Sequence, residues 1–114
     1  MAPTRTYLFS GAKPQVDHIF PLRLKGGDEV YRKRIDVIWN FRPMPAGVNN
    51  FKRARHPYEF FQSEEGRKHI DEYDYLPPIS NVELWRDDKR FIWRRKLKML
   101  RALKARYDLA LSRA

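Results

Sequence analysis

The C-terminal part of the chain carries the pattern of one long helix. From Asp87 to residue 113, apolar side chains recur every three or four residues, the spacing that places them on one helix face. They are Trp93, Leu97, Leu100, Leu103, Tyr107 and Leu111. Asp87 and Asp88 precede this stretch, where the helix dipole favours negative charge. We expect a basic amphipathic helix over about 87–113, whose apolar stripe covers the rest of the fold.

Charge is segregated along the 114 residues, which carry a formal net charge of +10 at pH 7. Residues 1–57 have 11 basic and 4 acidic side chains, residues 58–88 have 3 and 9, and residues 89–114 have 10 and one. This basic excess favours a polyanionic partner, either nucleic acid or an anionic membrane surface. The acidic block is either an internal counterion between the two basic blocks or a solvated acidic helical hairpin.

Several classes of protein are excluded by composition. The chain has no cysteine, which excludes disulfides, thiolate zinc sites and a cysteine nucleophile. Hydrophobic residues make up 42% of the chain, enough for a core and too many for a disordered tail. No apolar run approaches the roughly 20 residues that span a bilayer, and the N-terminus does not open a secretory signal. We expect a soluble cytoplasmic protein with a single domain over 1–114.

Two strands are expected in the first half of the chain. Residues 15–20 form a short stretch with β-branched side chains between two prolines, which indicates a strand. Residues 35–42 alternate apolar and polar side chains, which predicts a half-buried second strand that Pro43 and Pro45 end. Between them, residues 26–28 mark a turn within a long basic connection.

The second half reads as helical. Residues 48–55 are expected to form a short helix stopped by Pro57, and Pro57 itself fits the first turn of another helix, with Gly66 as a break. Ser80 and Glu83 have the spacing of a capping box. The predicted fold class is therefore α+β: a two-stranded antiparallel hairpin and a helix, followed by a helical extension over 58–114.

Three short patterns on the strand-and-helix unit carry chemistry: Asp17-His18 at the end of the first strand, Asn40 on the polar face of the second, and residues 49–52, Asn-Asn-Phe-Lys. Singly, each has an ordinary structural explanation, such as a surface hydrogen bond or a turn cap. Together they supply what hydrolysis of a phosphodiester needs. Carboxylate and amide oxygens suit Mg²⁺, histidine titrates near neutrality as a base for water, and Lys52 and its basic neighbours offer positive charge.

In order and approximate spacing, these patterns resemble the HNH endonucleases, whose core is the ββα-metal unit. The matching stretches are Val16-Asp17-His18-Ile19-Phe20-Pro21, Asn40-Phe41, Asn49-Asn50-Phe51-Lys52 and Pro57. The resemblance covers about residues 13–57, and it implies a metal-dependent endonuclease that nicks or cuts DNA, as in restriction or phage-defence systems. The paired CxxC zinc knuckles of many relatives are absent, so packing alone must brace the unit.

The resemblance also implies roles for individual residues. His18 corresponds to the general base, and Asp17 and Asn49 to the ligands of Mg²⁺, for which Mn²⁺ can substitute; Asn50 is the alternative ligand to Asn49. Asn40 corresponds to the residue that ties the long connection to the strand, and Lys52 to a phosphate contact or positioning residue. Because Asp17 and His18 are sequential, a regular strand directs them to opposite faces, so they share a site only where the strand ends or bulges.

Nucleic-acid contacts are expected from both basic blocks, mostly to the phosphate backbone. The candidate residues are Arg53, Arg55, Arg94, Lys98 and Arg101. DNA is the expected partner, with RNA as an alternative, and a second copy or a larger protein partner would supply specificity. Of the two further histidines, His69 is expected to be structural, and His56 is expected to be a solvated turn residue, with a phosphate contact as the alternative.

Two other functions compete with the nuclease. A non-catalytic nucleic-acid-binding protein would have the same charge and aromatic content. Attachment to a membrane surface by the 89–113 helix fits its apolar stripe. No membrane partner is expected, because the strand-and-helix unit needs that stripe as its cover.

Overall fold

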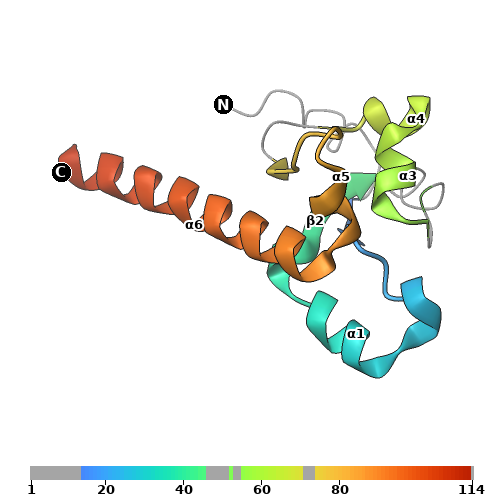
Figure 1. Ribbon diagram of the computed structural model, residues 1–114. Helices are drawn as coiled ribbons and strands as arrows, with labels where there is room; N and C mark the ends of the chain where they lie inside the picture. Colours follow the sequence, from blue (N-terminus) through green and yellow to red (C-terminus); the bar gives the residue numbers. More distant parts are fainter. Residues whose placement is uncertain (1–13, 46–51, 53–54, 71–73, 114) are drawn as a thin grey trace.

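The computed structural model describes residues 14–45, 52, 55–70 and 74–113. Two antiparallel strands pair, and several helices surround them, so the fold is α+β as predicted (Figure 1). The described elements in chain order are β1 Pro14–His18, η2 Leu24–Gly27, α1 Glu29–Ile35, η3 Ile38–Asn40, β2 Phe41–Pro45, α3 Pro57–Gln62, α4 Glu64–Arg67, α5 Val82–Arg86 and α6 Asp88–Ser112. None of these helices combines the length and apolar character that crossing a bilayer requires.

The first strand agrees with the sequence prediction, but the second begins later than predicted. β1 ends at His18, which lies opposite Phe41 of β2. The prediction of a strand over 35–42 is wrong for its first part, because Ile35 ends α1 and residues 38–40 form η3. The apolar alternation there arises from two short helical turns, in which Ile35 is buried and Trp39 is half-buried against the core.

Pro43 lies within β2 and does not end it, whereas Pro45 is its last residue. The N–H of Ile19 donates to the carbonyl of Asn40 at 2.9 Å. Counted from this pair, every second pair of opposing residues in the two strands is therefore a hydrogen-bonded pair. Both prolines fall on the alternate positions, whose backbone nitrogens point away from β1. Because a two-stranded sheet has only edges, proline there removes no ladder bond.

The connection between the strands contains a helix, α1, that the sequence analysis does not predict. Its turn is where the glycines predict it: Lys25 and Gly26 adopt left-handed backbone angles, with φ of 62° and 70°. Asp28 then caps the helix, because its carboxylate accepts from the N–H of Val30 at 3.1 Å. Tyr31 and Ile35, four residues apart, are the buried side chains of this otherwise charged helix.

The helix expected from Pro57 is confirmed as α3, with Pro57 at its start. The chain breaks at Ser63 and not at Gly66, which is buried inside α4. A Cβ on Gly66 would lie 1.8 Å from the carbonyl oxygen of Phe60, so only glycine fits there. The capping box predicted at Ser80 is wrong: α5 begins at Val82, after Asn81.

A single core joins the strand unit to the later helices. Its members are Ile19, Phe20, Tyr31, Ile35, Met44, Phe60, Phe61, Trp85, Phe91 and Ile92. Aromatic rings meet at its centre: the Phe91 ring lies 4.9 Å from that of Phe20 and 5.1 Å from that of Trp85. Phe91 belongs to α6, so this helix does contribute cover.

The long helix is confirmed, but the face that it buries differs from the predicted one. Asp87 caps α6 by accepting from the N–H of Arg90 at 3.2 Å. Only its first third contacts the body of the fold, through Phe91, Ile92 and Arg95, and the remainder projects outward (Figure 1). Most of the predicted stripe is exposed, so the cover that this helix provides comes from Phe91 and Ile92 on another face.

The acidic block supplies counterions at two points, to the buried Arg42 and to the partly exposed Arg34 and Lys25. Asp74 lies 3.2 Å from the guanidinium of Arg42, and both side chains are fully buried. Asp88 accepts from Arg34 at 2.6 Å and from Lys25 at 3.3 Å, which joins α6 to α1 and η2. At these two positions the internal-counterion alternative holds.

Candidate functional site

The candidate site lies at the end of β1, where Asp17 points to the buried face of the sheet. Asp17 is 3% exposed and lies opposite Arg42 in the strand register. Its Oδ1 accepts a hydrogen bond from the ammonium of Lys52 at 3.1 Å. Its Oδ2 is buried and has no hydrogen-bond partner among the described residues.

Lys52 connects this carboxylate to the backbone of the next residue. Its side chain is fully buried, and its Nζ also donates to the carbonyl of His18 at 2.8 Å. Lys52 therefore holds the last two residues of β1, Asp17 and His18, from the buried side. Lys52 itself thereby contacts the end of β1, whereas residue 49 lies outside the described residues.

Burial pushes both members of the Asp17–Lys52 pair towards their neutral forms. Desolvation raises the pKa of Asp17 and outweighs the favourable effect of Lys52 and Arg42. Desolvation lowers the pKa of Lys52 and outweighs the attraction of Asp17, and the nearby Arg42 lowers it further. Burial thus makes the charged form of each of these two side chains less favourable than it is in water.

His18 leaves the strand on the opposite, partly exposed face. Its Nε2 lies 2.9 Å from Oδ1 of Asp36, and its ring contacts the ring of Phe41 edge-on at 4.8 Å. An ionised carboxylate only accepts hydrogen bonds, so Asp36 fixes the neutral imidazole with its proton on Nε2. The other nitrogen, Nδ1, is then the atom that can take a proton.

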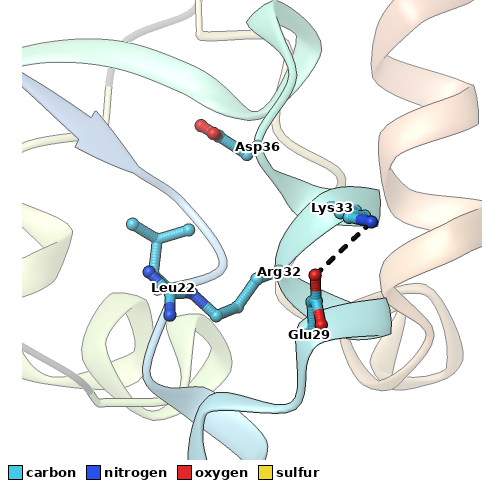
Figure 2. A pocket seen from close by; sticks show the side chains of 5 residues that line it. All are labelled: Leu22, Glu29, Arg32, Lys33 and Asp36. Carbon is cyan, nitrogen blue, oxygen red and sulfur yellow. Dashed lines mark ion pairs between the residues drawn. The ribbon is translucent and has the colours of Figure 1, made fainter.

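Asp36 also lies on the rim of a surface hollow of about 420 Å³ between α1 and the turn that follows β1. Figure 2 shows Arg32 reaching from α1 across this hollow towards Leu22, with the Glu29–Lys33 ion pair at its other end. The Glu29 and Lys33 charged groups are 3.4 Å apart. The imidazole of His18 therefore adjoins a hollow with a cation, Arg32, that has no ion pair among the described residues.

Asn40 ties the long connection between the strands to the end of β1. It is fully buried, and its Oδ1 accepts from the N–H of Phe20 at 3.0 Å. Its Nδ2 donates to the carbonyls of Phe20 at 3.0 Å and of Ile35 at 2.9 Å. The side chain thus fixes the backbone two residues beyond His18 and the end of the helix that carries Asp36.

The structure brings some predicted site residues together and separates others. Asp17, His18, Asn40 and Lys52 meet at the end of β1, but the side chains of Asp17 and His18 leave opposite faces. β1 ends at His18, which is the strand end that a shared site requires, yet no bulge turns the two side chains to one face. Lys52 contacts both residues, because its Nζ donates to the carboxylate of Asp17 and to the backbone carbonyl of His18.

Other predicted residues lie farther away or outside the described part. Asn49, its alternative Asn50 and Arg53 lie outside the described residues. Arg55 is exposed in the turn before α3, and Arg101 is exposed on the projecting part of α6, with Arg94 and Lys98 half-buried.

The two remaining histidines have structural contacts. His56 caps α3, because its Nδ1 accepts from the N–H of Tyr58 at 3.1 Å. Burial lowers the pKa of His56. His69 lies 3.3 Å from a carboxylate oxygen of Glu65.

Two residues near the site are not found by sequence reasoning. Asp36 is eighteen positions from His18 in the chain, and no local pattern marks their contact. Arg42 reads as a polar position of a half-buried strand, but it is 1% exposed and donates to the carbonyl of His69 at 2.6 Å. Only the alternation along the strand, which puts Arg42 level with Asp17, could have indicated that it faces the interior.

The donor chemistry at Asp17 fits a divalent cation. A buried carboxylate oxygen without a hydrogen-bond partner, Oδ2, is the hard ligand that Mg²⁺ prefers. The described residues contain no group of three or more His, Asp or Glu side chains that could hold a metal. The expected ligand set is smaller than such a group, because it pairs one carboxylate with the carboxamide of Asn49.

Comparisons of the chain with protein-family models, with curated proteins and with solved structures found no match. The HNH resemblance therefore depends on the sequence motifs and on the contacts described above.

Proposed function

We propose that the chain is a metal-dependent endonuclease of the HNH type, which hydrolyses phosphodiester bonds in DNA, and that residues 13–57 form its ββα-metal unit. The observation that carries this proposal is the junction at the end of β1. There Lys52 bonds both to the side chain of Asp17 and to the carbonyl of His18, at 3.1 and 2.8 Å. Lys52, from a later segment of the chain, thus contacts the side chain of the proposed metal ligand and the backbone of the proposed base.

In this proposal His18 removes the proton from the attacking water through Nδ1. Asp36 supports that role, since its carboxylate 2.9 Å from Nε2 orients the ring and stabilises the imidazolium that forms. Asn40 positions His18 by fixing the backbone at Phe20. Arg32, at the hollow beside Asp36, is placed to contact a phosphate.

Asp17 and Asn49 would hold Mg²⁺, or Mn²⁺ in its place, and the cation when bound supplies charge neutralisation at the reacting phosphate. Lys52 has a buried ammonium beside the same carboxylate, and its charge opposes the rise in the pKa of Asp17 that burial causes. The basic side chains of α6, among them Arg94, Lys98 and Arg101, would contact the DNA backbone without reading bases.

Nicking of supercoiled plasmid in the presence of Mg²⁺ tests the proposal. We expect the full chain to nick the plasmid, and EDTA, His18→Ala and Asn49→Ala each to remove the activity while DNA binding remains. His69→Ala is the matched control, because it deletes a histidine away from the junction. Circular dichroism of each variant checks that the fold is retained. Nicking that survives both His18→Ala and Asn49→Ala would refute the site assignment.

A second candidate function is a non-catalytic DNA- or RNA-binding protein. The specific observation in its favour is that Asp17 is already paired with Lys52, while His18 faces away from it. Such a protein would bind nucleic acid and leave it uncut with Mg²⁺, Mn²⁺ and other divalent cations, and His18→Ala would not alter binding. The same assay therefore separates the two functions.

A further inference from the structure

The long helix has two distinct faces, and only one of them contacts the fold. Phe91, Ile92 and Arg95 are buried against the body. At about 100° per residue, Trp93, Leu100 and Tyr107 lie roughly 110–150° around the helix from that face. Trp93 is 58% exposed, Leu100 41% and Tyr107 63%. We call this second face the stripe surface; it comprises Trp93, Leu97, Leu100, Leu103, Tyr107 and Leu111.

The stripe surface has the spacing that a second helix recognises. All of its residues except Leu103 fall at the a and d positions of successive heptads from residue 93 to residue 111; Leu103 takes a g position, next to Lys104 at the one seam position that is not apolar. This seam is about 27 Å long at 1.5 Å per residue. At the body end it begins in an apolar hollow of about 370 Å³ between α5 and α6, lined by Leu84, Trp93 and Leu97 among others.

The side chains along this seam are strongly basic. Arg94 and Arg101 lie along one edge and Lys96 along the other, where its ammonium is 5.3 Å from the centre of the Trp93 ring. The acidic residue at the edge of the seam, Asp108, is already paired with Lys104 at 2.6 Å. The seam and its edges therefore carry a net charge of about +3, and a second copy of the chain would add the same charge.

We propose that the stripe surface binds an acidic amphipathic helix of another protein. Its apolar residues would pack into the seam, and its carboxylates would face Arg94, Lys96 and Arg101. Charge complementarity favours this occupant over a second copy, and the heptad register favours a helix over a lipid surface, which needs no register. The proposal uses no residue of the junction at β1, but it shares Arg94 and Arg101 with the proposed DNA contacts, so an acidic helix bound there would compete with DNA for these two side chains.

The test uses the full chain and a synthetic 21-residue helical peptide with leucine at a and d and glutamate at e and g. Isothermal titration calorimetry should show binding at least tenfold tighter than to the same peptide with glutamine at e and g. A double variant of the seam, Leu100→Gln with Tyr107→Gln, keeps the charge and should weaken binding at least tenfold. Arg101→Gln should also weaken it, whereas Lys98→Gln, on the opposite face, should change it less than twofold.

Each alternative occupant gives a result that would overturn the proposal. Unchanged peptide binding by the Leu100→Gln, Tyr107→Gln variant would mean that charge alone acts, as for a nucleic acid. Dimers of the free chain that this variant abolishes in sedimentation equilibrium would identify a second copy as the occupant. Binding of phosphatidylserine vesicles, lost in the variant, without peptide binding would identify a lipid surface. Circular dichroism confirms that each variant keeps its helix content.

Discussion

Replacing Asn40 by alanine should destabilise the protein more than removing any other side-chain amide of the described residues. The side chain makes three hydrogen bonds of 2.9–3.0 Å to the N–H and carbonyl of Phe20 and to the carbonyl of Ile35. A buried backbone group that loses its partner costs about 1–3 kcal/mol. The three together amount to roughly 3–9 kcal/mol, a large part of the about 5–15 kcal/mol that stabilises a typical domain.

Urea denaturation followed by tryptophan fluorescence measures this loss. The matched control is Asn81→Ala, because Asn81 is exposed and its side chain makes no capping bond to α5; its effect should stay within about 0.5 kcal/mol. In thermal unfolding, Asn40→Ala should lower Tm by more than about 10 °C. A loss below about 1 kcal/mol for Asn40→Ala would show that Asn40 does not hold the end of β1.

Three further results are expected. Burial lowers the pKa of His56, so the unfolded chain binds the proton more tightly and stability should fall as pH drops from 6.5. His56→Asn keeps a cap for α3, and its urea midpoint should change less than that of the wild-type chain between pH 7 and 5.5. Gly66→Ala should destabilise by several kcal/mol, since its Cβ would meet the carbonyl of Phe60 at 1.8 Å; a wild-type Tm would contradict this. Burial alone would raise the pKa of Asp88, but hydrogen bonds from Arg34 and Lys25 outweigh it and hold the pKa below 3.8. The stability that Asp88 contributes is therefore present above about pH 4 and lost as pH falls through the lower folded value; Asp88→Asn should be less stable at pH 7 and show a shallower acid transition.

Features set by neighbours in the sequence were predictable. The start of α3 follows from Pro57, and the extent of α6 follows from its capping aspartate and its apolar repeat, because capping and periodicity act within a few residues. The first strand was also found, since it is short, β-branched and bounded by prolines. These signals are local, so no knowledge of the rest of the fold is needed to interpret them.

Features set by tertiary contacts were not predictable. The start of β2 depends on Asn40, whose partners Phe20 and Ile35 come from other elements. α1 was missed because only Tyr31 and Ile35 are buried on a helix that is otherwise charged. The exposure of the stripe on α6 was missed for a related reason: periodicity shows that a face exists, but not which face the core uses.

The same division applies to the candidate site. The motifs that contain Asp17 and Lys52 were recognised in the sequence, and the structure joins these two residues by a buried ion pair of 3.1 Å. The pairing of His18 with Asp36 was not foreseen, because it depends on how the connection folds back towards β1. The register of the strands likewise follows from the pairing with β2, whereas the opposite directions of Asp17 and His18 follow from the alternation of side chains along a regular strand.

Rescue of a His18 variant by added imidazole tests most directly whether this side chain is the base of a phosphodiesterase. His18→Gly would be compared with the wild-type chain in single-turnover cleavage of duplex DNA with Mg²⁺. We predict a loss of about 10²–10⁴-fold in rate, the usual contribution of a general base, and partial recovery when imidazole is supplied in solution. Wild-type rates in His18→Gly, or no cleavage by either protein under any divalent metal, would contradict the account.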